Sequence, residues 1–181
     1  MTEVVLLFGR PAAGKFTIGK LLAEELGYRL LHNHAVVDLV EALFPFGSEP
    51  FIKLREELWL AAIDAAVAAK LAGVILTFVA ERTVTDEFLP NLQKRAAVRF
   101  VELRCSEEET ARRMREESRA SFGKLRDPDF YRRLVADGVF SRPVMPPADV
   151  TIDVTELDAT RAAHSIAQQL SSLRGDFRSR S

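Results

Sequence analysis

Five short apolar runs have the length and composition of strands, and the first and third are apolar enough to be buried on both faces of a sheet. They cover residues 4–8, 28–31, 73–79, 98–103 and 150–154. The segments between them carry apolar residues at helical spacing or bounded by helix-start and helix-stop residues. These predicted helices cover residues 15–26, 35–44, 50–71, 85–96, 106–120, 129–136 and 158–173. Strands that alternate with helices indicate an α/β fold with a mainly parallel sheet covered on both faces.

The remaining segments indicate how the chain is divided. Residues 121–129 are polar and contain glycine and proline, which is typical of a mobile loop. Residues 174–181 are expected to form a frayed, flexible tail. With 181 residues and no internal repeat, the chain suits one domain and would be cramped with two. We therefore expect a single domain over residues 1–173, followed by the tail.

Composition narrows the classes of function. Apolar residues make up 48% of the chain and charged residues 28%, which excludes disorder as the main state. The net charge of −1 argues against a nucleic-acid partner. No apolar run approaches the roughly 20 residues that span a bilayer, and we recognise no secretion signal, so no membrane partner is expected. The single cysteine, Cys105, cannot form an internal disulfide, which favours the reducing cytoplasm.

A glycine-rich segment between the first strand and the first helix carries the strongest chemical signal. It reads Gly9-Arg10-Pro11-Ala12-Ala13-Gly14-Lys15-Phe16-Thr17. Glycines let the backbone curl so that several N–H groups face phosphate oxygens, and the helix N-terminus adds partial positive charge. The lysine then reaches the β- and γ-phosphates. An ordinary glycine turn is disfavoured because strand, turn, lysine and helix all agree.

The segment resembles the phosphate loop of the small P-loop kinases, a group that includes shikimate kinase, gluconate kinase, nucleoside monophosphate kinases and antibiotic phosphotransferases. Nucleoside monophosphate kinases similarly have Gly-Lys-Gly-Thr where this chain has residues 14–17. The resemblance implies a sheet of strand order 2-3-1-4-5 with the site at the carboxyl ends of the strands. It also implies ATP and Mg²⁺ as cofactors, a lid over residues 119–130, and Thr17 as the residue that orients Mg²⁺ or phosphate.

Three patches are most similar to shikimate kinase. The third strand ends in Val-Ile-Leu-Thr at residues 74–77, and the segment 44–51 is similar to that family's Phe-x-x-x-Gly-Glu-x-x-Phe. Arg112 and Arg119 match the spacing of the arginines that stack on adenine and close from the lid. The resemblance therefore implies adenine binding by Arg112 and phosphoryl-group contact by Arg119, with Arg126 next in line.

The acceptor side departs from that family. Residues 32–34, His-Asn-His, stand where shikimate kinase has Asp-Ser-Asp, and Ile52 stands where its carboxylate-binding arginine is. The triple glycine after the third strand is replaced by residues 78–80, and the lid Arg-Pro-Leu-Leu is absent. Shikimate is therefore not the expected substrate. Nucleoside monophosphate kinases have Asp where Thr77 stands, which weakens the assignment to that group as well.

Four residues after the second strand are candidates for acceptor chemistry. On a strand, His32 and His34 would face the same way, and a neutral histidine suits a general base. Asn33 could hydrogen-bond the substrate or a metal-bound water. Asp38 lies one helical turn after His34 and could act as base or position Mg²⁺ through water. The alternative is structural hydrogen bonding at a strand end for one or both histidines, and a surface position on the helix for Asp38. A metal site of both histidines and Asp38 is a further one, whereas a His-Asn-His nuclease lacks its ββα module.

Two arginines outside the lid are also candidates. Arg82 follows the third strand and could hold an anionic acceptor, with a structural ion pair as the alternative. Arg55 lies on the long helix near the expected acceptor cleft, with pairing on a solvated helix face as the alternative. Six basic residues fall within residues 112–126, and the glutamates at 107–109, 116 and 117 interleave with them, so most of these basic side chains are expected to be solvated.

Together these features predict an ATP-dependent kinase that phosphorylates a hydroxyl of an unidentified small molecule. Lys15, His32, Asp38 and Arg119 are the expected catalytic residues. A nucleotide kinase is one alternative, and a nucleotide-binding regulator without acceptor turnover is another. The sequence leaves open whether the protein is a monomer or a homodimer.

Overall fold

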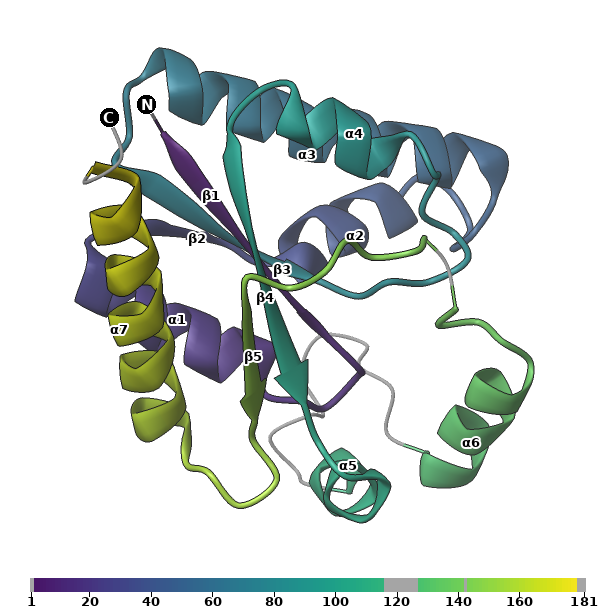
Figure 1. Ribbon diagram of the computed structural model, residues 1–181. Coiled ribbons are helices and arrows are strands. Elements are labelled where there is room, and N and C mark those ends of the chain that lie inside the picture. Colours follow the sequence, from purple (N-terminus) through teal and green to yellow (C-terminus); the bar gives the residue numbers. More distant parts are fainter. Residues whose placement is uncertain (1, 116–126, 142, 179–181) are drawn as a thin grey trace.

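The computed structural model describes residues 2–115, 127–141 and 143–178, and its centre is a five-stranded sheet (Figure 1). The strands pair in the order β2-β3-β1-β4-β5, and every pair is parallel. They are β1 (Glu3–Gly9), β2 (Arg29–Leu31), β3 (Gly73–Phe78), β4 (Ala97–Arg104) and β5 (Val150–Asp153). Both the predicted α/β fold and the predicted strand order are confirmed.

The helices lie close to their predicted positions but differ at the ends. They are α1 (Lys15–Leu26), α2 (Asn33–Glu41), α3 (Glu49–Ala68), α4 (Phe88–Gln93), α5 (Glu107–Met114), α6 (Pro128–Ala136) and α7 (Ala159–Arg178). The prediction that the tail begins at residue 174 is wrong for its first part, because α7 continues to Arg178. Helix α5 ends at Met114 rather than near residue 120, and residues 116–126 lie outside the described part. None of the described helices is long and apolar enough to span a membrane.

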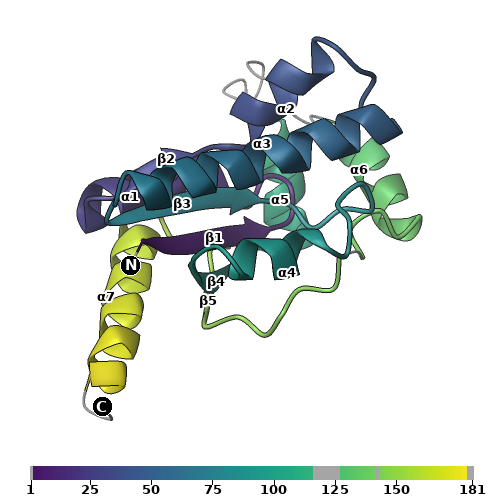
Figure 2. The same ribbon diagram turned by 90° about the horizontal axis from the view of Figure 1, so that it is seen from above.

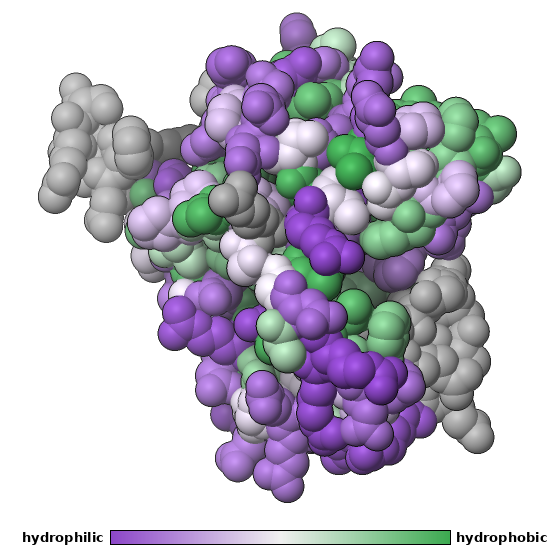
Figure 3. Space-filling view, turned by 90° about the vertical axis from the view of Figure 1, so that its right-hand side faces the viewer, coloured by the Kyte–Doolittle hydropathy of each residue, from purple (hydrophilic) through white to green (hydrophobic). Residues whose placement is uncertain are grey.

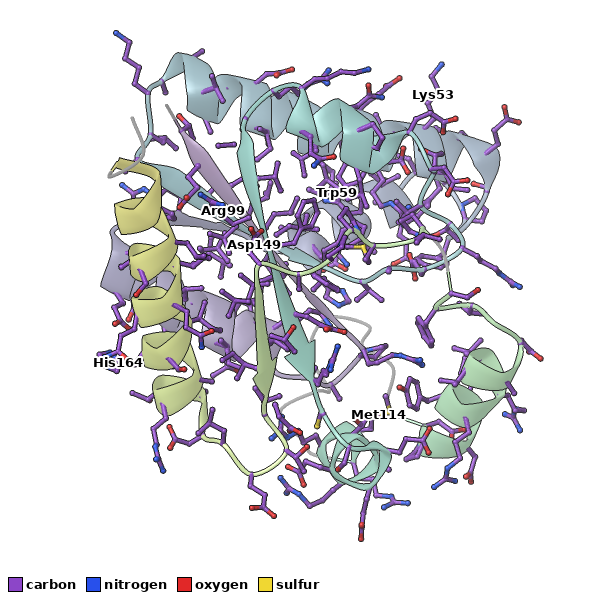
Figure 4. The ribbon with its side chains drawn as sticks, viewed as in Figure 1. Lys53, Trp59, Arg99, Met114, Asp149 and His164 are labelled. Carbon is purple, nitrogen blue, oxygen red and sulfur yellow. The ribbon has the colours of Figure 1, made fainter. Side chains whose placement is uncertain are left out.

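The central strand β1 contributes to two separate cores, one on each face of the sheet. Val4, Leu6 and Phe8 pack under α2, α3 and α4, whereas Val5 and Leu7 pack under α1 and α7. This division follows from the side-chain alternation along a strand. Figure 2, seen from above, shows α3 and α4 on the near side of the sheet. The first core includes the ring of Trp59, which lies between α3 and the sheet (Figure 4), 5.1 Å from the ring of Phe88.

A polar cluster closes the end of the sheet opposite the carboxyl ends of the strands. Glu3, at the start of β1, accepts hydrogen bonds from the Tyr28 hydroxyl, at 2.8 Å, and from the Arg174 guanidinium. Burial and the nearby Glu3 carboxylate raise the pKa of Tyr28 to about 12. The cluster ties α7 to the first two strands. It also accounts for the helix at residue 174, where the sequence predicted a frayed tail.

Candidate functional site

The phosphate loop lies at the carboxyl end of β1 and leads directly into α1. Gly9 has φ 155°, and a Cβ at this position would lie 2.5 Å from the backbone oxygen of Leu103. Gly14, the residue before α1, has φ 87°. Ala12 also has a positive φ of 65°, so part of the curl is formed without glycine. The loop therefore has a tightly curled backbone with three positive φ values, at Gly9, Ala12 and Gly14.

The lysine of the loop is folded across it. Lys15 Nζ donates to the backbone oxygens of Gly9, at 2.8 Å, and Arg10, at 2.7 Å. The arch of the loop, between Arg10 and Gly14, consists of Pro11, Ala12 and Ala13, and both alanines are buried. A cation held at the mouth of a loop at a helix N-terminus suits a polyphosphate.

The two residues after the lysine lie on the first turn of α1. Thr17 is exposed on this turn. Phe16 is 38% exposed, and its ring centroid lies 4.5 Å from that of His32. This contact joins the phosphate loop to the predicted acceptor residues, which the sequence alone did not show.

The acceptor residues lie at the junction of β2 and α2 rather than on a strand. His32 is the residue before α2, with extended backbone, and Asn33 begins the helix. The prediction that strand alternation directs His32 and His34 to one side is therefore wrong. Their rings nevertheless lie close, with centroids 5.3 Å apart. His34 Nδ1 lies 3.8 Å from a carboxylate oxygen of Asp38, so the expected proximity of those two residues one turn apart is confirmed.

Thr77, on β3, holds the junction of β2 and α2 through its side-chain hydroxyl. Its hydroxyl oxygen accepts a hydrogen bond from the backbone N–H of Asn33 at 3.0 Å and lies 3.1 Å from His32 Nδ1. Thr77 itself is only 1% exposed. Asn33 Oδ1 is buried without a hydrogen-bond partner, a polar atom available to a ligand.

Three apolar side chains close to this junction in sequence are at least half exposed: Leu39, Leu43 and Phe46. Figure 3 shows hydrophobic and hydrophilic side chains mixed on one face of the molecule.

Arg55 lies on the long helix α3, as predicted, but its side chain is buried. Its side chain is 1% exposed, so both the acceptor contact and the alternative of a solvated pair are wrong for this structure. The guanidinium donates to Glu81 at 3.0 Å and to the backbone oxygen of Thr83 at 2.6 Å. It also lies over the rings of Phe51 and Trp59. Burial lowers the pKa of Arg55, and the Glu81 carboxylate opposes this effect.

Arg82 lies in the part of the chain that the structure describes, whereas the lid candidates Arg119 and Arg126 do not. Arg82 is exposed, and its backbone N–H donates to the oxygen of Val139, just after α6, at 2.7 Å. Contact of its side chain with an anionic acceptor stays a prediction. Arg119, the predicted phosphoryl-group contact, lies outside the described residues, as does Arg126.

Helix α5 carries the predicted adenine contact and a residue that sequence analysis missed. Arg112 is 62% exposed and pairs with Glu109, whose pKa falls to about 2 because both Arg112 and Arg113 donate to it. Arg113 is half-buried and also donates to the backbone oxygen of Val154. Its guanidinium reaches within 3.8 Å of the Cβ position at Gly14. Arg113 therefore links the phosphate loop to the end of β5, a role that only a contact between distant segments reveals.

Helix α6 also contacts the phosphate loop. Tyr131 packs with Ala12 and Met114 in a small buried cluster, and Figure 4 shows Met114 between α5 and α6. The Arg10 guanidinium lies over the ring of Phe140, 5.7 Å from its centroid. Helices α5 and α6, which come before and after residues 116–126 in the sequence, are thus packed against the phosphate loop.

The described residues do not form a protein-held metal centre. Among the residues that the structure describes, no three His, Cys, Asp or Glu side chains come together as a metal site, so the site of two histidines and Asp38 is excluded there. Mg²⁺ fits this arrangement, because it keeps several waters and is commonly held by substrate phosphates with few protein ligands.

Comparison with known proteins rests on structure alone. No protein-family model matches the chain, and no curated protein sequence matches it. Solved structures do. A gluconokinase from Sinorhizobium meliloti 1021 superposes with a TM-score of 0.64 at 20% identity over 99% of this chain and 97% of its own. The chain has the fold of the small P-loop kinases.

Two further neighbours support the same fold. The shikimate kinase from Acinetobacter baumannii has a TM-score of 0.65 at 22% identity, covering 95% of this chain and 94% of its own. The APS kinase of Mycobacterium tuberculosis, in complex with AMPPNP and APS, has a TM-score of 0.59 at 14% identity, covering 94% and 98%. In this P-loop kinase fold, the phosphate loop and the β2–α2 junction both lie at the carboxyl ends of the strands.

Proposed function

We propose that the protein transfers the γ-phosphoryl group of ATP to a hydroxyl of a small molecule. The observation that carries this proposal is the contact between Phe16 and His32, at 4.5 Å between ring centroids. It places a phosphate loop and a cluster of imidazole, amide and carboxylate groups side by side at one edge of the sheet. The fold neighbours named as kinases of gluconate, shikimate and APS add support.

The loop residues perform the nucleotide half of this reaction. The backbone N–H groups of the loop and the α1 N-terminus bind the phosphates, and Lys15 exchanges the oxygens of Gly9 and Arg10 for the β- and γ-phosphates. Mg²⁺ supplies charge neutralisation when bound, with Thr17 as its protein ligand or as a ligand of its water. Arg112 contacts the adenine ring, and Arg119 contacts the group in transfer.

The junction residues perform the acceptor half. The hydroxyl oxygen forms a bond to the γ-phosphorus as the bond from phosphorus to the β,γ-bridging oxygen breaks, and that electron pair leaves with ADP. The hydroxyl proton passes to a basic side chain of the junction, for which His32, His34 and Asp38 are the described candidates. Because phosphoryl transfer depends mainly on positioning and charge neutralisation, Asn33 contributes by fixing the acceptor.

The test is nucleotide binding followed by turnover. Calorimetry with a non-hydrolysable ATP analogue and Mg²⁺ should show binding to the wild type that is lost in Lys15→Ala. Lys20→Ala is the matched control, because Lys20 is exposed on the same helix but lies more than a turn after Lys15. ADP release is then measured across a panel of sugars, polyols and nucleosides.

The outcomes separate the alternatives. Acceptor-dependent ADP release supports the kinase. Binding without turnover of any acceptor favours the nucleotide-binding regulator, and absence of binding to the folded wild type refutes the proposal.

A further inference from the structure

The hydroxyl of Thr77 has limited hydrogen-bonding choices. The backbone N–H of Asn33 can only donate, so at 3.0 Å it occupies a lone pair of Thr77 Oγ1. The hydroxyl proton must then find an acceptor elsewhere. Thr77 is 1% exposed, which excludes bulk water as that acceptor. Among the described residues, His32 Nδ1, at 3.1 Å, is the acceptor that the hydroxyl meets.

This arrangement determines the protonation of the His32 ring. A buried hydroxyl proton without an acceptor is costly, so Thr77 donates to Nδ1 rather than the reverse. A neutral imidazole that accepts at Nδ1 carries its proton on Nε2. Nε2 is buried, and the ring that carries it packs against Phe16, the residue after the phosphate-loop lysine.

Resting on the proposed function, we infer that His32 is a hydrogen-bond donor to the transfer site and not its general base. A ring protonated on Nε2 has no lone pair for the acceptor's proton. An N–H directed at oxygens that gain charge during phosphoryl transfer stabilises the transition state. Thr77 is the positioning residue that fixes this tautomer. The role first expected for His32 is thereby reversed.

The proton of the acceptor hydroxyl is then removed by His34, in the first turn of α2. The Asp38 carboxylate lies 3.8 Å from His34 Nδ1 and stabilises the imidazolium that forms when His34 takes up a proton. The acceptor hydroxyl thus loses its proton to His34, its oxygen bonds to phosphorus, and ADP leaves with the electron pair of the broken bond. His32 holds its own proton throughout.

The tautomer can be observed without nucleotide or acceptor. The chain has three histidines, so ¹⁵N-labelled imidazole spectra can be assigned by comparing single His→Gln variants. At a pH where the rings are neutral, we expect His32 to show protonated Nε2 and unprotonated Nδ1. Thr77→Ser keeps the hydroxyl and should keep this pattern, whereas Thr77→Val should lose it. A wild-type ring protonated on Nδ1 overturns the inference, even if Thr77→Val does not fold.

Kinetics give an independent test once an acceptor is found. A glutamine side chain places an amide N–H near the position of Nε2 but cannot take up a proton. We expect His32→Ala to lose kcat by about 100-fold, the usual effect of removing a donor to a charged transition state, and His32→Gln to recover at least about tenfold of that loss. Equal loss in both variants would identify His32 as the base. The spectra remain informative if no kinase activity is found, so the two proposals fail separately.

Discussion

The buried ion pair of Arg55 and Glu81 should be the most sensitive charge pair in the described part of the protein. Arg55 is 1% exposed and Glu81 18%, and the carboxylate also accepts from the Thr83 hydroxyl at 2.7 Å. Glu81→Gln preserves shape and hydrogen-bond acceptors but leaves a buried guanidinium without its counter-charge. Arg55→Met instead removes the deeply buried charge and leaves a carboxylate that reaches solvent. The two variants therefore differ in which charge stays unpaired.

The size of the effect follows from this burial. Removing one partner of a fully buried pair costs about 3–5 kcal/mol; because Glu81 is partly exposed and Gln still accepts hydrogen bonds, we expect about 2–3 kcal/mol for Glu81→Gln. For a chain of this size, each kcal/mol corresponds to roughly 2–4 °C in Tm, so the melting temperature should fall by roughly 5–10 °C. Arg55→Met should cost less than Glu81→Gln, because packed apolar groups replace buried ions at little cost.

Urea denaturation of both single variants and the double variant measures the coupling. The double variant should be more stable than the sum of the single effects implies, by about 1 kcal/mol or more. Asp64→Asn serves as the matched control, because it breaks an exposed pair with Arg95 whose expected contribution is at most about 1 kcal/mol. A loss in Glu81→Gln no larger than in Asp64→Asn, with additive single effects, would refute the reasoning.

Three further predictions concern the nucleotide side. Gly9→Ala should abolish nucleotide binding in calorimetry, because its Cβ would lie 2.5 Å from a backbone oxygen of β4; unchanged affinity would show that the loop relaxes easily. Glu109 has a folded pKa of about 2, below its usual 4.5, so its contribution to stability is present above pH 4.5 and lost as pH falls toward 2. Urea midpoints across this range should fall more steeply in wild type than in Glu109→Gln, with the exposed Glu108→Gln as control. Arg113→Leu should weaken ATP-analogue binding more than Arg112→Leu, since Arg113 is anchored beside the loop by its hydrogen bond to Val154, whereas Arg112 is 62% exposed; the opposite order would favour adenine stacking as the dominant contribution.

Local sequence signals were enough for the fold and the phosphate loop. The strand order followed from a family resemblance based on residues 9–17 and the alternation of strands with helices. Features made by one continuous segment, such as the loop and the pairing of His34 with Asp38, were predicted correctly. Helix ends were less accurate, because the position where α7 ends depends on the contact between Arg174 and Glu3, far apart in the sequence.

The acceptor side was harder to predict because its contacts join distant segments. Arg55 has polar neighbours along the helix and therefore resembles a surface residue, yet Glu81 and Thr83, on a different element, draw it into the interior. The role of His32 depends in the same way on Thr77, 45 positions later. Spacing within a motif cannot reveal a hydrogen bond of this kind, so residue type alone suggested a base where the hydrogen bonds indicate a donor.

The unequal anchoring of the two halves of the site has a consequence for local opening. The phosphate loop follows β1, which is paired on both sides and fully buried from Val4 to Leu7. The acceptor residues follow β2, an edge strand of three half-exposed residues paired only with β3. Amide protons of β1 should therefore exchange at rates close to global unfolding, while β2 and the start of α2 exchange through smaller openings. Under the proposed function, nucleotides would meet a rigid surface, and acceptors would meet one that can adjust to their shape.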